Sequence, residues 1–241
     1  MEETTRREIA DVCARLHARG WVANHDGNVS VRVGEARFLA SPTAVSKAAV
    51  RPEALILVDA DGKVVAGERK VFSEIALHLA CFRARPDIAW VVHAHPPTAS
   101  GWAVAGQSFF DPPFMAEPVV SLGASIPLVP WSSPGGSTDD LAMAVRVADA
   151  VLLQNHGVIT LGKDAETAFL RMELVEHLAR IALAAHALGG ARPIPREDVE
   201  RLLAARAKAG LNAGSGSASA PILADKPDVG ELVREALRRL G

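Results

Sequence analysis

The sequence predicts a mixed α/β protein built around one sizeable core. An amphipathic helical pattern opens the chain, short strand patterns separated by turn signals follow, and a long helical pattern comes after two further strands. Of the 241 residues, 49% are hydrophobic, which is enough to fill the interior of one domain of this length. We therefore expect a single domain over residues 1–241, in which 209–241 is a less certain C-terminal extension.

The first third of the chain is expected to form one helix and then a strand-rich segment. Residues 3–17 carry apolar side chains at helical spacing. Short apolar runs at 28–33, 36–40 and 54–59 are separated by turn sequences such as HDGN, SPT and DADGK. This pattern favours antiparallel hairpins, ending near Arg69.

A second helix and a strand follow. Ser73 offers an N-cap oxygen to the first turn of a helix that Pro86 stops, so Glu74 lies at the positive end of that helix. The run IAWVVHAH is predicted to be a strand. Because side chains of a strand alternate with period two, His93 and His95 project from the same face.

The second half of the chain is predicted to contain a helix, a strand pair and further helices. A helix is expected over 138–148, followed by the strands AVLLQ and VITL with His156 in the turn between them. Asp164 is a good N-cap for a long helix, and a short helix is expected near 196–208. A Gly/Ser-rich flexible stretch and an amphipathic segment over 232–240 complete the chain.

Charge and composition exclude several functions. With 26 basic and 28 acidic side chains the formal net charge is −2, which predicts neither nucleic-acid binding nor a membrane-binding patch. The N-terminus lacks the apolar core of a signal peptide, and no apolar run reaches membrane-spanning length. Cys13 and Cys81 lie in apolar helical contexts without CxxC spacing, as in a reducing compartment. We expect a cytoplasmic protein that acts on a small molecule.

Three histidines are candidate ligands of a divalent metal ion, for which zinc is expected. Catalytic zinc sites use three protein donors and leave one position open. The pair His93 and His95 supplies two donors, and His156, beside a glycine in a tight turn, is the candidate for the third. Taken alone, His93 and His95 could equally be ordinary polar residues at the end of a strand.

Glu74 is the candidate acid or base. A partly desolvated carboxylate near a metal ion can titrate close enough to neutrality to move a carbon-bound proton. The alternative is an ordinary first-turn glutamate that interacts with the helix dipole. His78 lies one turn further along the same helix face and could support the site from behind. The DGNVS and SPT turns can aim amides and hydroxyls at an anion.

Five motifs, read in order, resemble the class II aldolase/adducin family, in particular its L-fuculose-1-phosphate aldolases. They are GNVS, SPT, SE, RPDIAWVVHAHPPTA and QNHGVITLG, and the resemblance covers about residues 9–188. It implies a three-layer α/β/α sandwich with a central, mostly antiparallel sheet. It also implies a homotetramer with zinc-dependent active sites at subunit interfaces.

The resemblance also assigns roles by position. It implies that His93, His95 and His156 hold the metal ion, and that Glu74 moves the proton while a metal-stabilised enediolate forms. The implied reaction is that of a lyase, a class II aldolase that cleaves a carbon-carbon bond of a small hydroxy-carbonyl compound, such as a sugar phosphate. The positions that match phosphate contacts are Gly27, Asn28, Thr43 and Ser73.

Three departures from the family pattern keep other functions open. Phe72 replaces a serine, Ala44 replaces a glycine, and Phe114 aligns with a tyrosine in a chain that contains no tyrosine. The more apolar surroundings favour, as an alternative, a decarboxylase or dehydratase acting on a hydroxy-acid or an aromatic carboxylate. A further alternative is a non-catalytic, adducin-like interaction module, which would need no metal site.

Overall fold

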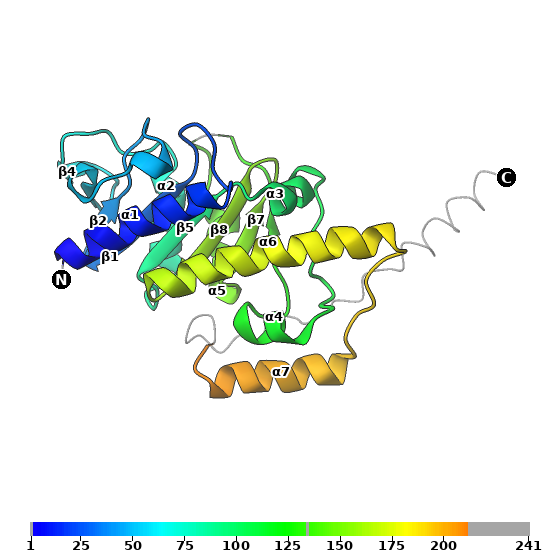
Figure 1. Cartoon of the computed structure of the whole chain (residues 1–241). Helices are drawn as coiled ribbons and strands as arrows, with labels where there is room; N and C mark the ends of the chain where they lie inside the picture. The colour runs from blue at the N-terminus through cyan, green and yellow to red at the C-terminus, as the bar shows by residue number, and fades with distance from the viewer. Residues whose placement is uncertain (1, 134, 212–241) are drawn as a thin grey trace.

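The structure is a computed structural model that describes residues 2–133 and 135–211 (Figure 1). The predicted flexible stretch and the amphipathic segment over 232–240 lie outside the described residues. None of the described helices is long and apolar enough to cross a membrane.

An eight-stranded sheet forms the centre of the molecule, in the order β4-β3-β2-β1-β5-β8-β7-β6. All neighbouring strands are antiparallel except β6 and β7, which are parallel. The predicted mostly antiparallel sheet is therefore confirmed. The strands are β1 Asn28–Gly34, β2 Arg37–Ala40, β3 Ile56–Asp59, β4 Val64–Ala66, β5 Trp90–Ala94, β6 Leu128–Val129, β7 Ala150–Leu153 and β8 Gly157–Gly162.

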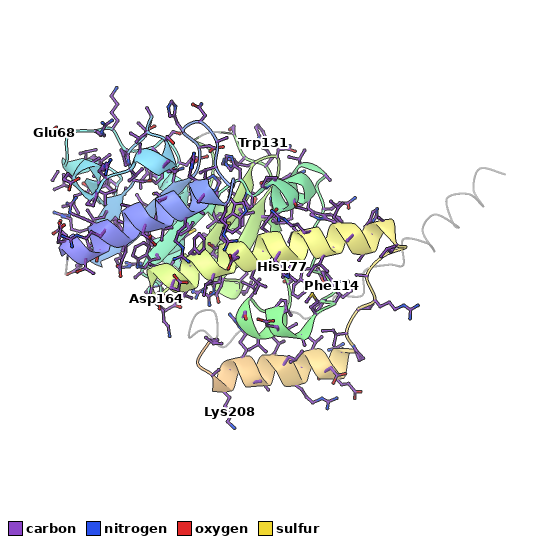
Figure 2. The ribbon with its side chains drawn as sticks, viewed as in Figure 1. Glu68, Phe114, Trp131, Asp164, His177 and Lys208 are labelled. Atoms are coloured by element: carbon purple, nitrogen blue, oxygen red, sulfur yellow. The ribbon has the colours of Figure 1, made fainter. Side chains whose placement is uncertain are left out.

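Helices cover both faces of this sheet, which completes the predicted three layers. The helices α1, α3 and α6 pack on one face, α2 and α5 pack together on the other, and α4 packs against α7 (Figure 1). Figure 2 shows Asp164 at the start of the long helix α6 and Lys208 at the end of α7. The helices are α1 Glu2–Ala18, α2 Ile75–Ala84, α3 Pro97–Val104, α4 Ala116–Ser121, α5 Asp139–Val147, α6 Ala165–Ala187 and α7 Arg196–Lys208.

The alternation of side chains along β5 determines the face of the sheet from which His93 projects. Trp90, Val92 and Ala94 point into the apolar cluster shared with α1 and α6, whereas Val91 points into the cluster shared with α2 and α5. His93 is two residues after Val91 and so projects toward the α2 face. The candidate functional side chains gather on that face, at the end of β5.

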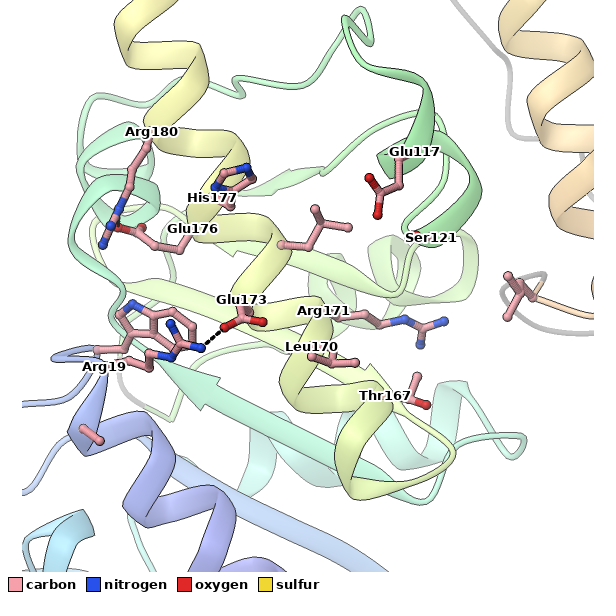
Figure 3. A pocket seen from close by; sticks show the side chains of 14 residues that line it. Arg19, Glu117, Ser121, Thr167, Leu170, Arg171, Glu173, Glu176, His177 and Arg180 are labelled. Carbon is pink, nitrogen blue, oxygen red and sulfur yellow. Dashed lines mark hydrogen bonds and ion pairs between the residues drawn. The ribbon is translucent and has the colours of Figure 1, made fainter.

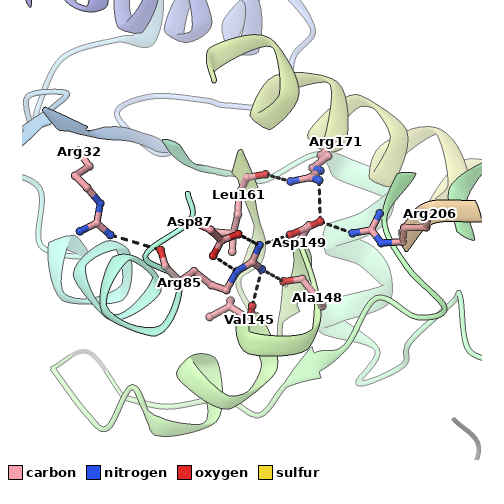
Figure 4. A network of polar contacts seen from close by, with 9 residues as sticks. All are labelled: Arg32, Arg85, Asp87, Val145, Ala148, Asp149, Leu161, Arg171 and Arg206. Atoms are coloured by element: carbon pink, nitrogen blue, oxygen red, sulfur yellow. Dashed lines mark hydrogen bonds and ion pairs between the residues drawn. The ribbon is translucent and has the colours of Figure 1, made fainter. Parts of the chain in front are cut away.

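Buried ion pairs fasten the helices around the sheet behind this region (Figure 4). Asp149 lies in the link between α5 and β7. It is 1% exposed, and its carboxylate pairs with three arginines. Arg85 at the end of α2 lies 2.9 Å from it, Arg171 of α6 lies 2.7 Å from it, and Arg206 of α7 is the third partner. A single carboxylate therefore links α2, α6 and α7.

Two local predictions about helix starts have different outcomes. The side chain of Asp164 accepts a hydrogen bond from the amide of Thr167, so the predicted N-cap of α6 is confirmed. The predicted cap at Ser73 is wrong, because α2 begins at Ile75 with Glu74 at the N-cap position and without a side-chain capping bond. The Glu74 carboxylate instead turns toward the sheet, where it meets polar partners.

Some elements were not predicted from the sequence. Helix α3 follows His95 directly and has Pro97 in its first turn, where the missing amide of proline costs no helical hydrogen bond. The prediction treated these prolines only as the end of β5. The short elements β4, α4 and β6 were also not predicted, since two to six residues give too little periodicity to detect.

Candidate metal centre and active site

Three histidine side chains converge at one end of the sheet. His93 is in β5, His95 lies just beyond it, and His156 lies in the turn between β7 and β8. Their ring centroids are 4.7 to 5.0 Å apart, and one donor atom from each ring lies within 4.8 Å of the other two. The three rings are therefore close enough to share one ion.

A glycine allows this close approach. Gly157 follows His156 and starts β8, and a Cβ atom built on it would lie 2.5 Å from Cδ2 of His95 and 2.6 Å from the carbonyl oxygen of Ala94. Any larger residue would collide with a backbone atom of β5 and with a histidine ring. The preceding Asn155 has φ 57°, a left-handed conformation that asparagine tolerates better than most residues.

The hydrogen bonds of two rings fix where their lone pairs point. Nδ1 of His93 lies 2.9 Å from the carbonyl oxygen of Val158, and Nδ1 of His95 lies 3.0 Å from Oδ2 of Asp26. Both partners can only accept, so each Nδ1 donates and each Nε2 presents a lone pair. The two Nε2 atoms are 3.1 Å apart, a separation at which lone pairs repel unless a cation lies beside them.

A metal ion fits this arrangement better than a proton does. Burial lowers the pKa of His93 to about 3, and it also lowers the pKa of His95, even though Asp26 opposes the shift there. Both rings are therefore neutral near pH 7, as metal ligands must be. Three imidazole donors that leave room for a further ligand are typical of a catalytic zinc site.

Glu74 lies beside the three rings. Its Oε1 is 2.7 Å from Nε2 of His156, and its Oε2 is 3.6 Å from Nε2 of His93. The side-chain amide of Asn28 donates to Oε2 at 2.6 Å. The first residue of β1 thus orients the carboxylate toward the histidines.

The charge state of Glu74 differs from the one we expected from the sequence. Burial acts to raise the pKa of this carboxyl, but the hydrogen bond to His156 and the nearby His93 and His78 outweigh it and lower the pKa to about 2. The prediction was a carboxyl that titrates near neutrality. In this arrangement Glu74 is a charged carboxylate near neutral pH.

Behind these residues lies a buried polar contact. Nδ1 of His78 is 2.6 Å from Oγ of Ser30, and its ring packs against Phe72 with centroids 4.9 Å apart. Burial lowers the pKa of His78 to about 3. His78 is therefore a neutral ring, and its support of the site stays a prediction.

The four residues predicted to bind phosphate lie on segments that meet at the site. Gly27 has φ 70°, and a Cβ atom there would meet the side chain of Val22 and lie 3.1 Å from the carbonyl oxygen of His93. Asn28 is paired with His93 in the sheet and already holds Glu74. The amide of Thr43 is occupied by the carbonyl of Lys70 at 3.1 Å, and Ser73 is exposed beside Glu74. Phosphate binding by these residues stays a prediction.

The three departures from the family pattern have different structural settings. Phe72 is 3% exposed and packs behind the site. Ala44 has φ 55°, the left-handed conformation for which the glycine of the family pattern is better suited. Phe114 packs on Phe110 with ring centroids 5.3 Å apart, next to α4. Phe72 thus contacts His78, which is on the same helix as the residues that follow Glu74.

Two polar residues at the site were missed from the sequence. Asp26 was treated as a turn residue only, although its carboxylate contacts His95. Lys47 is 1% exposed, and its ammonium donates to the carbonyl oxygens of His25 and Val45. No sequence signal distinguishes a buried lysine from an exposed one. An aspartate shortly before a strand could have been considered as a hydrogen-bond partner of a candidate histidine ligand.

A separate cavity lies elsewhere on the molecule. A cavity of about 830 Å³ runs along α6 and is lined by residues that include Arg19, Glu117, Arg171 and His177 (Figure 3). Arg19 is paired with Glu173 at its edge. None of the three clustered histidines lines this cavity. The convergence of donor atoms, and not the volume, therefore locates the candidate site.

Comparisons with known proteins identify relatives of this chain. A 5-deoxy-D-ribulose 1-phosphate aldolase from Bacillus thuringiensis serovar kurstaki is 31% identical over 202 residues, which span 82% of this chain and 92% of that protein. The 3-oxo-tetronate 4-phosphate decarboxylase of Escherichia coli strain K12 is 31% identical over 203 residues, which span 80% of this chain and 91% of that protein. Relatives with two different lyase reactions are thus equally similar.

A solved structure and a family model also match the chain. The structure of an L-fuculose 1-phosphate aldolase superposes with a TM-score of 0.75 at 25% identity and covers 83% of this chain and 94% of that chain. The model of the family described as "Class II Aldolase and Adducin N-terminal domain" matches residues 7–183, more than half of the sequence. The chain therefore belongs to the class II aldolase and adducin family.

Proposed function

We propose that this protein is a metal-dependent lyase that cleaves a carbon-carbon bond of a small hydroxy-carbonyl compound, with a sugar phosphate as the first choice of substrate. The observation that carries the proposal is the convergence of His93, His95 and His156 with the Glu74 carboxylate 2.7 Å from His156. A divalent ion, which we propose to be zinc, would be held by the three histidines. Such an ion polarises a carbonyl and stabilises the negative charge that develops on its oxygen.

Glu74 would move the proton of the reaction. It is charged, it is held at one oxygen by Asn28, and its other oxygen points to the ligand cluster. A base placed within hydrogen-bond reach of a reacting group contributes about 10² to 10⁴ in rate. Asn28 would fix the direction from which the carboxylate reaches the substrate.

Hydrogen bonds to the ligand rings prepare the site before an ion binds. Val158 and Asp26 hold the rings of His93 and His95 with Nε2 turned inward. A shift of the ring proton from Nδ1 to Nε2 would break the hydrogen bond of that ring. We therefore propose that the three histidines bind the metal ion and that Glu74 transfers the proton. The hydrogen-bond acceptors Val158 and Asp26 orient two of the histidine rings.

A decarboxylase is the second candidate, and one observation favours it. An aldol cleavage removes a hydroxyl proton and delivers another to carbon, whereas loss of carbon dioxide needs only the second step. The sequence contains no tyrosine, so no phenol can share proton transfer with Glu74. The decarboxylase named above is also as similar as the aldolase.

One experiment separates the two reactions. The zinc-loaded protein is incubated with ketose 1-phosphates and, separately, with a 3-oxo sugar-acid phosphate, and triose phosphate and carbon dioxide are measured. Triose phosphate from the ketose supports the aldolase, whereas carbon dioxide from the oxo acid supports the decarboxylase. Glu74→Gln serves as the control, and turnover that survives in this variant contradicts the proposed role of Glu74.

Assembly and location are part of the proposal. The family resemblance supports a homotetramer in the cytoplasm, which sedimentation and cell fractionation would test. A non-catalytic interaction module would have no use for a metal site. Metal analysis that finds no stoichiometric divalent ion in the purified protein would favour that module.

A further inference from the structure

A buried lysine lies behind the candidate metal site. Lys47 is 1% exposed, and its Nζ donates to the carbonyl oxygen of His25 at 3.1 Å and to that of Val45 at 3.2 Å. Burial lowers the pKa of this ammonium, and the charges of Asp26 and Glu74 oppose the shift. A buried charge is costly, so a lysine at this place needs a reason beyond the filling of space.

The first of the two carbonyls belongs to the turn that holds a candidate metal ligand. His25 precedes Asp26, whose Oδ2 accepts from Nδ1 of His95 at 3.0 Å, and whose Oδ1 accepts from the amide of Ala23. Asn24 in this turn has φ 51°. The amide of Asp26 also donates to the carbonyl of Ala23 at 3.0 Å, so the position of the Asp26 carboxylate depends on the shape of this short turn.

The second carbonyl belongs to the turn predicted to meet the substrate's anionic group. Within this turn, the amide of Ser41 donates to the carbonyl of Val29 at 2.9 Å, and the amide of Thr43 donates to the carbonyl of Lys70 at 3.1 Å. These bonds place residues 41–45 between the start of β1 and the segment that leads to Glu74. Lys47 thus joins two turns that border the same site.

We propose that Lys47 is a positioning residue that holds the 23–27 turn against the 41–45 turn, and so keeps Asp26 in place to orient His95 for metal binding. This inference rests on the proposed metal site. The connection runs from the Lys47 ammonium to the His25 carbonyl, then through the peptide bond to Asp26 and across 3.0 Å to His95. A carboxylate that orients a metal-binding histidine typically contributes 10-fold to 100-fold in metal affinity.

Zinc affinity, measured by chelator competition, tests this connection. Asp26→Asn is expected to weaken zinc binding by about 10-fold to 100-fold. Lys47→Met removes the ammonium but keeps much of the volume, and it is expected to weaken zinc binding by about 10-fold through the same carboxylate. Lys63→Met, at a lysine that is 76% exposed in a turn, is the matched control and is expected to leave the affinity unchanged.

The double variant distinguishes positioning from a general loss of stability. If Lys47 acts through Asp26, the double variant that carries both Lys47→Met and Asp26→Asn binds zinc about as well as the single variant Asp26→Asn. Additive losses would overturn the inference. Full zinc affinity in a folded Lys47→Met protein would also overturn it, whereas a wild-type protein without zinc affinity would overturn the proposed function as well.

A second variant and a spectroscopic signal cover the case in which Lys47→Met does not fold. Lys47→Gln keeps an N–H donor without burying a charge, and its zinc affinity is expected between those of the wild type and Asp26→Asn. The Nδ1 proton of His95, detected by NMR, is expected to be sharp in the wild type and broadened in Lys47→Gln. An unchanged signal together with unchanged affinity would contradict the positioning role.

Discussion

Replacing Gly157 with alanine tests the geometry of the histidine cluster. The added Cβ would lie 2.5 Å from Cδ2 of His95, 2.6 Å from the carbonyl oxygen of Ala94 and 3.3 Å from Cε1 of His93. Carbon atoms in good contact are about 3.5 to 4.0 Å apart, so the first two contacts overlap by nearly an ångström. The carbonyl belongs to the paired strand β5 and cannot move cheaply, so the His95 ring has to shift.

The size of the effect follows from this overlap. Overpacking of a tight interior costs about 1–3 kcal/mol, which for a chain of this size lowers the Tm by roughly 2–12 °C. A His95 ring that moves away from His93 no longer presents its lone pair to the same point. We therefore expect Gly157→Ala to lose zinc affinity by at least tenfold.

The assay combines thermal unfolding with chelator competition, and the chain offers a matched control. A Cβ at Gly101 in α3 would meet nothing within 4 Å, so Gly101→Ala is expected to leave zinc binding unchanged and to stabilise the helix by about 0.5–1 kcal/mol. A Gly157→Ala protein with the Tm and zinc affinity of the wild type would refute the reasoning.

Four further predictions concern Glu74, the ion pairs of Asp149 and the two cysteines. Glu74→Gln is expected to keep zinc affinity within about threefold and to lose at least about 100-fold in turnover, and equal losses in both would contradict its separate role. Asp149→Asn leaves the buried Arg85 and Arg206 and the partly buried Arg171 without their shared charge, and is expected to lower the free energy of unfolding by about 3–5 kcal/mol in denaturant titrations. A loss under about 1 kcal/mol would count against the ion-pair cluster. Burial raises the pKa of both Cys13 and Cys81 to about 12, so neither thiol should react with iodoacetamide at pH 8 until the protein unfolds. Because both folded pKa values exceed the unfolded ones, the same shifts predict that stability declines as the pH rises above about 9, which unfolding curves at pH 8 and 10 would check.

The part of the site that periodicity determines could be predicted from the sequence. The alternation of IAWVVHAH predicted a strand with two histidines on one face, and the structure contains β5 with both rings side by side. The Asp164 cap and the long helix after it were predicted for a similarly local reason, since a cap acts on the next three residues. Local patterns were sufficient for these elements.

Long-range contacts explain what the sequence did not predict. Ser73 has the chemistry of an N-cap, but Glu74 takes that position because its carboxylate binds Asn28 of β1, 46 residues earlier. The hydrogen bond between His95 and Asp26 spans 69 positions, and nothing in the HDGN turn indicates it. The buried ammonium of Lys47 meets the carbonyl of His25, 22 residues earlier, as well as that of nearby Val45. Such pairings depend on the folded sheet.

The most direct test of the central claim is the zinc content of the purified protein at equilibrium, compared among the wild type, His95→Ala and Glu74→Gln. The proposed site predicts one zinc ion per chain in the wild type and in Glu74→Gln, and almost none in His95→Ala. Full zinc content in His95→Ala, or none in the wild type, would contradict the assignment of the three histidines as the metal site.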